Sequence, residues 1–115
     1  MGAAIFAAAL PFGLSAQSAQ LSSSPNYHLL QLTVETGKVA RGAFETKTEA
    51  IRSCGDALQL ARELDADVKR DRFIMDHQMP ASLRNALREL PTGQATSVFS
   101  TDPSLMRVIV LCARV

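Results

Sequence analysis

The chain has 115 residues, 47% of them hydrophobic, which suits one domain with a modest core and argues against extensive disorder. Its net charge is only +1, Lys and Arg do not form runs longer than two, and 5% of the residues are aromatic. These values argue against a nucleic-acid-binding surface, which needs a basic stripe or aromatic side chains for base stacking.

The chain begins with an apolar run, Met1–Leu14. This run is too short to cross a bilayer core about 30 Å thick as a helix. Its length is typical of the apolar part of a signal peptide, with a small-residue cleavage site at Leu14-Ser15-Ala16, but no positively charged segment precedes it. We keep two interpretations, an atypical export signal and the remaining helix of a longer parent protein. The serine-rich Gln20–Asn26 predicts a linker, so a segment of residues 1–25 precedes a domain of residues 26–115.

The first predicted strand is Tyr27–Val34, in which neighbouring side chains point to opposite faces of a sheet. One face carries His28, Leu30, Leu32 and Val34, and the other carries Tyr27, Leu29, Gln31 and Thr33.

Two helices are expected after this strand. The first runs from about Arg41 to Arg52. The second covers Asp56–Leu64 and follows Ser53, which forms an approximate S-x-x-D cap with Asp56. The side chains expected to face inward are Phe44, Thr48 and Ile51 in the first helix, and Ala57, Leu60, Ala61 and Leu64 in the second.

The next segment, Asp65–Asp76, is polar and holds at most one short edge strand. Its only large aliphatic or aromatic groups are Val68, Phe73 and Ile74. Acidic and basic side chains alternate along it, a pattern of a solvated loop rather than of paired catalytic carboxylates. The acidic residues are Asp65, Asp67, Asp71 and Asp76, and the basic ones are Lys69, Arg70 and Arg72.

The last third of the chain predicts a helix followed by a hairpin. The helix opens at Met79-Pro80, where proline suits the first turn, and its apolar stripe is Leu83, Ala86, Leu87 and Leu90. Pro91–Gln94 ends the helix and turns the chain. Two strands then follow over Ala95–Thr101 and Leu105–Cys112, joined by an Asp-Pro turn.

This order of elements resembles the second half of a parvulin-type peptidyl-prolyl isomerase domain. Leu90–Thr96 (LPTGQAT) is similar to the family's Leu-x-x-Gly-(Glu/Gln)-x-(Ser/Thr) turn, and Arg107–Arg114 to its closing strand. Tyr27–Val34 and Phe44–Leu64 resemble the opening strand and the covering helices. The resemblance implies an α+β fold of the parvulin/FKBP type, with a small antiparallel sheet of about four strands covered by three or four helices.

The two cysteines are similar to a pair in divergent parvulin domains of the SurA-type periplasmic chaperone. Cys54 precedes a predicted helix and Cys112 ends the last predicted strand. In a parvulin-like fold these helices pack across the sheet, so the two residues come close. In an exported protein they are expected to form a disulfide, since such bonds persist in oxidising compartments. The alternative is two free, buried cysteines that act as small hydrophobic residues.

The resemblance also implies a site. Met79 falls at the family's pocket methionine and Leu83 where a phenylalanine is common, and Phe99 completes the set of candidate proline-binding residues. Gln31 and Arg107 occupy the positions of the two strand histidines. The family's Gly-Gly-Asp-Leu-Gly segment at the pocket mouth is replaced by Lys69–Asp76.

From this resemblance we expect a domain of an exported, periplasmic folding factor that binds unfolded or extended polypeptides, such as outer-membrane protein clients, with weak or no isomerase activity. One alternative is an active divergent isomerase that uses Met79, Leu83 and Phe99. Another is a small exported interaction protein with no role in folding. SurA-type chaperones carry a large helical module before their isomerase domains, so the chain is either a fragment, a truncated reading frame or a lone domain.

No cofactor or metal is expected. Prolyl isomerisation needs neither, and His28 and His77 are far apart in sequence. The spacing of His and Cys residues does not resemble a zinc site.

Overall fold

The fold is built around a central strand that has a partner on each side. β1 (Asn26–Glu35) lies between β2 (Asp67–Met75) and β3 (Leu105–Arg114), and both pairings are antiparallel. The computed structural model describes residues 26–114. The expected signal-like run and most of the expected linker lie outside these described residues, and so does Val115.

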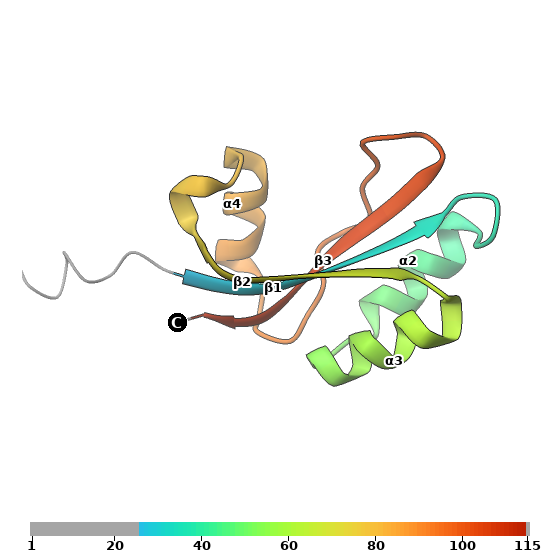
Figure 1. The fold of residues 1–115 in the computed structure, drawn as a ribbon, viewed down its shortest axis with the longest axis horizontal. Helices are drawn as coiled ribbons and strands as arrows, with labels where there is room; N and C mark the ends of the chain where they lie inside the picture. Colours follow the sequence, from blue (N-terminus) through green and yellow to red (C-terminus); the bar gives the residue numbers. More distant parts are fainter. Residues whose placement is uncertain (1–25, 115) are drawn as a thin grey trace, which may run out of the picture.

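Three α-helices cover this sheet. α2 (Arg41–Glu49) and α3 (Cys54–Leu64) lie on one side of the strands, and α4 (Ala81–Glu89) lies on the other side near the opposite end (Figure 1). A short 3-10 turn, η1 (Asp76–Gln78), joins β2 to the α4 segment. The antiparallel sheet and these helices confirm the predicted α+β class. None of the helices formed by residues 26–114 combines the length and the apolar character needed to cross a membrane.

The helix boundaries differ slightly from the predicted ones. α2 ends at Glu49 rather than at Arg52, because Ser53 takes an extended conformation in order to cap α3. The Ser53 hydroxyl accepts a hydrogen bond from the Asp56 backbone N–H at 3.0 Å, so the predicted cap is confirmed, and α3 starts two residues earlier than expected. Pro80 is the N-cap of α4 rather than a residue of its first turn.

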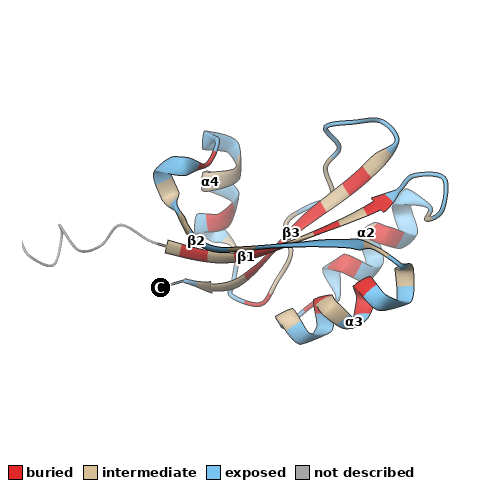
Figure 2. Cartoon of the chain, in the orientation of Figure 1, coloured by how far each residue is buried: buried red, intermediate tan, exposed pale blue. Residues whose placement is uncertain are grey.

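Two hydrophobic clusters lie on opposite faces of the sheet. The first packs α2 and α3 against the sheet and contains Leu30, Leu32, Val34, Phe44, Ile51, Ala57, Leu60, Ala61, Met106, Val108 and Val110. The second packs α4 against the other face and contains Tyr27, Leu29, Met79, Leu87, Ile109 and Leu111. Cluster membership follows the strand alternation: along β1, Tyr27 and Leu29 enter the second cluster and Leu30, Leu32 and Val34 enter the first, which confirms the two-faced pattern predicted for β1. Both faces of β3 are covered as well, so the consecutive residues 108–111 are all buried (burial is coloured in Figure 2).

Within residues 26–114 the sheet has three strands rather than the expected number of about four. The predicted strand Ala95–Thr101 makes two isolated bridges to β3, Ala95 with Val110 and Phe99 with Arg107. Between these bridges the Thr96 hydroxyl accepts the hydrogen bond of the Ile109 N–H at 3.0 Å. A side chain thus replaces a backbone carbonyl in the ladder, and the segment follows the outer edge of β3 without forming a regular strand.

The segment predicted as a mostly solvated loop forms the nine-residue strand β2. Its sequence lacks a buried stripe, but its backbone pairs with β1 from Asn26–Met75 to Thr33–Asp67. The register shifts between Tyr27 and Leu29, where β2 carries one extra residue and Phe73 takes a φ of 60°. Pairing with β1 therefore determines the conformation of this segment, which its charge pattern did not reveal.

The predicted turn after α4 is confirmed, and its geometry explains why residue 93 is a glycine. Gly93 has a φ of 95°, and a Cβ at this position would collide with the backbone carbonyl of Arg52. The Gly93 N–H donates to the Leu111 carbonyl at 2.6 Å. This turn thus packs directly against β3 and against the connection between α2 and α3.

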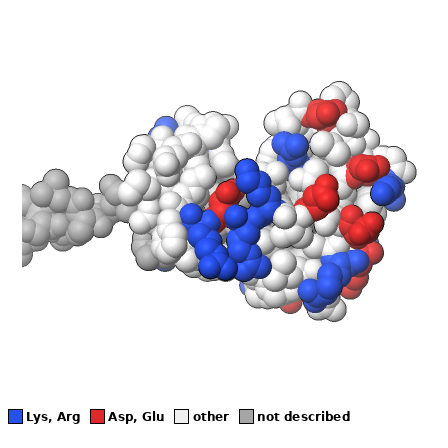
Figure 3. All heavy atoms as spheres, in the orientation of Figure 1, with Lys and Arg blue, Asp and Glu red and all other residues white. Residues whose placement is uncertain are grey.

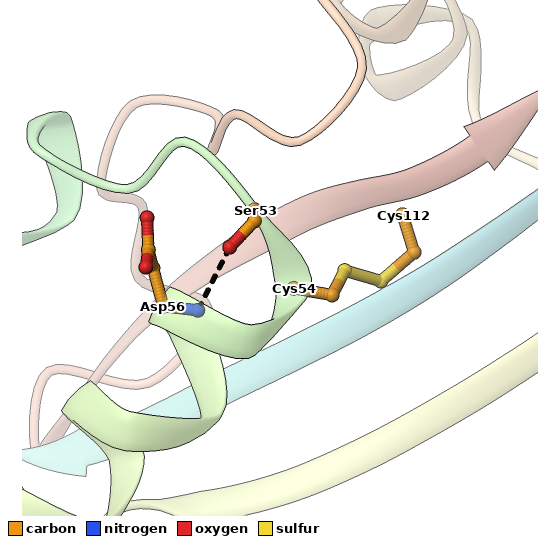
Figure 4. The surroundings of a disulfide bond; sticks show 4 residues. All are labelled: Ser53, Cys54, Asp56 and Cys112. Carbon is orange, nitrogen blue, oxygen red and sulfur yellow. Dashed lines mark hydrogen bonds between the residues drawn. A yellow bond between two sulfur atoms is a disulfide. The ribbon is translucent and has the colours of Figure 1, made fainter.

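A disulfide joins the first residue of α3 to β3. Cys54 and Cys112 are bonded, with their Cα atoms 5.5 Å apart, and 58 positions separate them in sequence (Figure 4). This pairing agrees with the expected disulfide, and the alternative of two free cysteines is wrong. The bond anchors α3 beside the point where β3 leaves the first hydrophobic cluster.

We expect the double substitution Cys54→Ala with Cys112→Ala to lower the free energy of unfolding by about 4 kcal/mol, since the bond closes a long loop in the unfolded chain. Urea unfolding followed by circular dichroism measures this change. Dithiothreitol should destabilise the parent protein by a similar amount and leave the double variant unchanged. A loss well below 1 kcal/mol in both experiments would contradict the expectation.

Candidate functional site

The carboxylate of Asp76 links α4 to β1, through Arg84 in the middle of the helix and Arg88 in its last turn. Tyr27 Oη donates a hydrogen bond to Asp76 Oδ1 at 3.2 Å, and Arg88 Nη2 lies 2.9 Å from Asp76 Oδ2. Arg84 Nε is 4.0 Å from the same oxygen, and the Asp76 side chain is only 15% exposed. The prediction that Asp76 belongs to a solvated loop is therefore wrong. The signal for its role was the pair Arg84 and Arg88, four residues apart on one helical face.

The C-terminal end of α4 is held by Arg114 at the end of β3. Its guanidinium donates to the backbone carbonyls of Leu87, Arg88 and Leu90, the last at 2.8 Å. Leu87 and Arg88 belong to the last turn of the helix and Leu90 is its C-cap, where carbonyls run out of intrahelical N–H partners; the Leu90 N–H also donates to the Leu87 carbonyl at 3.4 Å. A cation here also complements the negative end of the helix dipole. Asp76 and Arg114 thus both attach α4 to the rest of the fold near its C-terminal end.

The three apolar residues predicted to form a proline pocket all lie on the α4 face of the sheet. Met79 is 6% exposed and belongs to the second hydrophobic cluster, while Leu83 and Phe99 are half-buried and pack against that cluster. The three residues belong to separate segments: Met79 precedes Pro80, Leu83 is in α4, and Phe99 is in the irregular segment along β3. Leu83 and Phe99 leave apolar surface accessible, and Met79 supports this surface from within the core.

Gln31 and Arg107 lie on the same face of the sheet as this apolar surface. Gln31 is opposite Ile109, a member of the second cluster, and paired residues share a face. Arg107 forms a bridge with Phe99, with backbone N–H to carbonyl distances of 2.8 and 2.9 Å. Gln31 and Arg107 are therefore diagonal neighbours on adjacent strands, and Arg107 is paired with Phe99.

The guanidinium of Arg107 has unused hydrogen-bonding capacity. Its Nη1 donates to the Thr101 hydroxyl at 3.0 Å, while its buried Nε has no partner among residues 26–114. Within the same residues no carboxylate lies within 4.0 Å of it. Nearby, the Ser104 backbone N–H and hydroxyl donate to Asp102, and these bonds lower the pKa of that carboxyl group. Arg107 is thus a cation beside an apolar surface, able to donate to a carbonyl oxygen.

Both cysteines are in the disulfide, so neither is available as a nucleophile. In the part of the chain that the structure describes, no group of three or more His, Cys, Asp or Glu side chains could hold a metal ion. What the face offers is apolar contact from Leu83 and Phe99 together with hydrogen-bonding groups on Gln31 and Arg107.

No match to this chain was found among protein-family models, curated proteins or solved structures.

Tyr27 provides a pH-dependent test of the contact between β1 and Asp76. Burial raises the pKa of its phenol, and the hydrogen bond to Asp76 raises it further. Above the ordinary pKa of 10.0 the unfolded chain loses this proton while the folded chain retains it. The free energy of unfolding should therefore fall as the pH rises above about 10.

The measurement is urea unfolding between about pH 8 and 11, comparing the parent with Tyr27→Phe. The parent should lose stability faster with rising pH than the variant. Parallel curves for the two proteins would show that the Tyr27 phenol has the same proton affinity in the folded and unfolded states.

Proposed function

We propose that this is a parvulin-like domain of an exported folding factor, which holds extended segments of unfolded polypeptides and does not catalyse prolyl isomerisation at a useful rate. In this proposal the three strands and the helices on both sheet faces are a reduced version of the parvulin/FKBP fold. The clients include outer-membrane protein segments.

The observation that carries the proposal is the bridge between Phe99 and Arg107, on the sheet face where Leu83 packs. It pairs an aromatic residue with a guanidinium, and Phe99 and Leu83 pack against the same hydrophobic cluster. An extended peptide presents alternating side chains and regularly spaced carbonyl oxygens. Apolar side chains of the peptide would contact Leu83 and Phe99, and a carbonyl would accept a hydrogen bond from Arg107.

The same face lacks the groups with which the family is expected to promote isomerisation. The barrier to rotation of a peptide bond is about 18–20 kcal/mol, and a catalyst must favour the twisted amide over the planar forms. The family's two strand histidines are replaced by Gln31 and Arg107. Lys69–Asp76, in place of the segment that shapes the pocket mouth, is mostly strand β2 paired to β1. Met79 is buried in the core, which limits how far a proline ring could enter.

The disulfide supports the proposed location. A bond between Cys54 and Cys112 persists in an oxidising compartment and is reduced in most cytosols. The periplasm is such a compartment, and it is where unfolded outer-membrane proteins require a binding partner.

Binding is tested with a synthetic peptide that has the alternating apolar pattern of an outer-membrane β-strand. We expect amide chemical shifts of Leu83, Phe99 and Arg107 to change on addition of the peptide. The double substitution Leu83→Ala with Phe99→Ala should weaken binding about tenfold, because it removes the accessible apolar contacts.

Val68→Ala is the matched control, since Val68 is an exposed apolar residue on β2, away from α4. It should leave affinity within about twofold of the parent. Thermal unfolding confirms that each variant is folded. Shift changes confined to other surfaces, or an equal loss from Val68→Ala, would contradict the proposed binding face.

Isomerase activity is tested with a protease-coupled assay on a proline-containing peptide. We expect the rate in the presence of the domain to equal the uncatalysed rate, because neither strand histidine is present. A rate comparable to that of active parvulins would instead favour the alternative of a divergent isomerase that uses Met79, Leu83 and Phe99.

A further inference from the structure

A second candidate site lies on the opposite face of the sheet, beside the disulfide. It is a cavity of about 340 Å³ lined by His28, Leu29, Cys54, Leu58, Arg70, Arg72, Phe73 and Cys112. Its volume is at the lower end of the range for small-ligand sites, about 300–1,000 Å³. None of the residues that form the proposed polypeptide-binding face lines it, so the two sites can be tested separately.

The walls of this cavity are largely apolar. α3 contributes Leu58 and one half of the disulfide, β3 contributes the other half, and β2 contributes Phe73. The Phe73 ring meets the His28 ring edge-on, with centroids 4.9 Å apart. Phe73 is nevertheless 64% exposed, so a ligand in the cavity could cover part of its surface.

Two cations border the same cavity. Arg70 and Arg72 of β2 both line it; Arg70 pairs with Leu30, on the face of the first hydrophobic cluster, and Arg72 lies at the register shift. Figure 3 shows Lys and Arg side chains gathered at the waist between two lobes of the molecule, around an acidic side chain. Neither Arg70 nor Arg72 has a carboxylate within 4.0 Å among the described residues. The neighbouring Asp71 pairs with Leu29, which places Asp71 on the other face.

The buried Nε2 atom of His28 is a further polar group without a hydrogen-bond partner in the described part of the chain. Buried polar atoms in folded proteins are nearly always paired, so such an atom beside a cavity is consistent with a ligand that would satisfy it.

The backbone at Phe73 supports a role for its ring beyond packing. With a φ of 60°, this residue adopts a left-handed conformation that a bulky side chain rarely takes. The register shift at this point directs the ring toward His28 and the cavity rim rather than into either hydrophobic cluster. A glycine would adopt this conformation more easily, but it would remove the aromatic wall.

We propose that this cavity binds a carboxylate joined to an aromatic or branched aliphatic group. Arg70 and Arg72 hold the carboxylate, and the apolar group lies between Phe73, Leu58 and the disulfide. Such chemistry occurs both in small apolar acids and at the free C-terminus of a peptide that ends in an apolar residue.

The test uses the full 115-residue chain and two probes of the same shape, 3-phenylpropionate and 3-phenylpropionamide. Binding is followed by amide chemical shifts and by calorimetry. We expect the acid to shift the resonances of His28 and Leu58 and to bind about tenfold more tightly than the amide. Equal binding of acid and amide, or no shifts with the acid at about 20 mM, would overturn the proposal.

Substitutions that neutralise a cation at different positions along β2 supply the comparison variants. Arg70→Gln with Arg72→Gln should weaken binding of the acid about tenfold, whereas Lys69→Gln should change it less than about twofold. Lys69 lies on the same strand but pairs with Gln31, so its side chain is on the other face. If Lys69→Gln weakened binding as strongly as the double variant, the attraction would be general electrostatics and the proposed site would be wrong.

Phe73→Gly tests the apolar half of the site. The variant should keep or raise the thermal unfolding temperature, because glycine accepts this backbone conformation, and should weaken binding of the acid. Unchanged affinity in the folded variant would remove Phe73 from the site and overturn the proposal in this form.

The source of the carboxylate is identified with acetylated peptides ending in phenylalanine, compared as free acid and as amide. Tighter binding of the peptide acid than of 3-phenylpropionate would indicate a chain end as the ligand. Equal or weaker binding of the peptide acid would indicate a small apolar acid. Separate variants distinguish this inference from the proposed polypeptide-binding face. Phe99→Ala should leave binding of the acid at this cavity intact, and the cavity variants should leave binding of the polypeptide at the other face intact.

Discussion

β1 is hydrogen-bonded on both edges and buries side chains on both faces. Leu30, Leu32 and Val34 enter the cluster beneath α2 and α3, while Tyr27 and Leu29 enter the cluster beneath α4. Because side chains alternate along a strand, a shift in register by one residue would exchange these two sets. The positions of the helices, of β2 and of both candidate sites all depend on this one strand keeping its register.

Each layer is also attached to the sheet by a specific polar or covalent contact. The Cys54–Cys112 disulfide holds the start of α3 against β3. On the other face, Asp76 and Arg114 attach α4 near its C-terminal end. A chain of this size buries a limited apolar area, so such contacts contribute a large share of a total stability of about 5–15 kcal/mol. The two proposed binding regions lie beside these attachment points, which keeps their side chains in place.

The two candidate sites use different chemistry on opposite faces. The face near α4 offers half-buried apolar groups with a single guanidinium, Arg107, which suits the carbonyl groups and side chains of an extended polypeptide. The cavity by the disulfide offers two guanidinium groups without acidic partners among the described residues, which suits a charged ligand. The separation follows from the strand geometry, since Arg107 and Arg70 belong to positions that point in opposite directions.

Short-range sequence patterns correctly predicted the elements that depend on residues close together in the chain. The alternation in β1, the Ser53 cap, the inward Phe44 and the turn at Gly93 each depend on residues within a few positions of one another, and each is present. β2 was missed because its conformation comes from pairing with β1, about forty positions away, and not from its own apolar content. The expected fourth strand was lost because the Thr96 hydroxyl takes a ladder position, a contact that depends on where β3 lies.

The amino-acid sequence by itself determined the α+β class, the two-faced first strand and which residues are candidates for each role, because these follow from side-chain type and spacing. Only the tertiary structure decided which candidates meet. It places Phe99 beside Arg107, closes Cys54 onto Cys112, and converts Asp76 from a loop carboxylate into the anchor of α4. The physical reason is that these contacts join segments many positions apart, and their geometry exists only once the strands have paired in register.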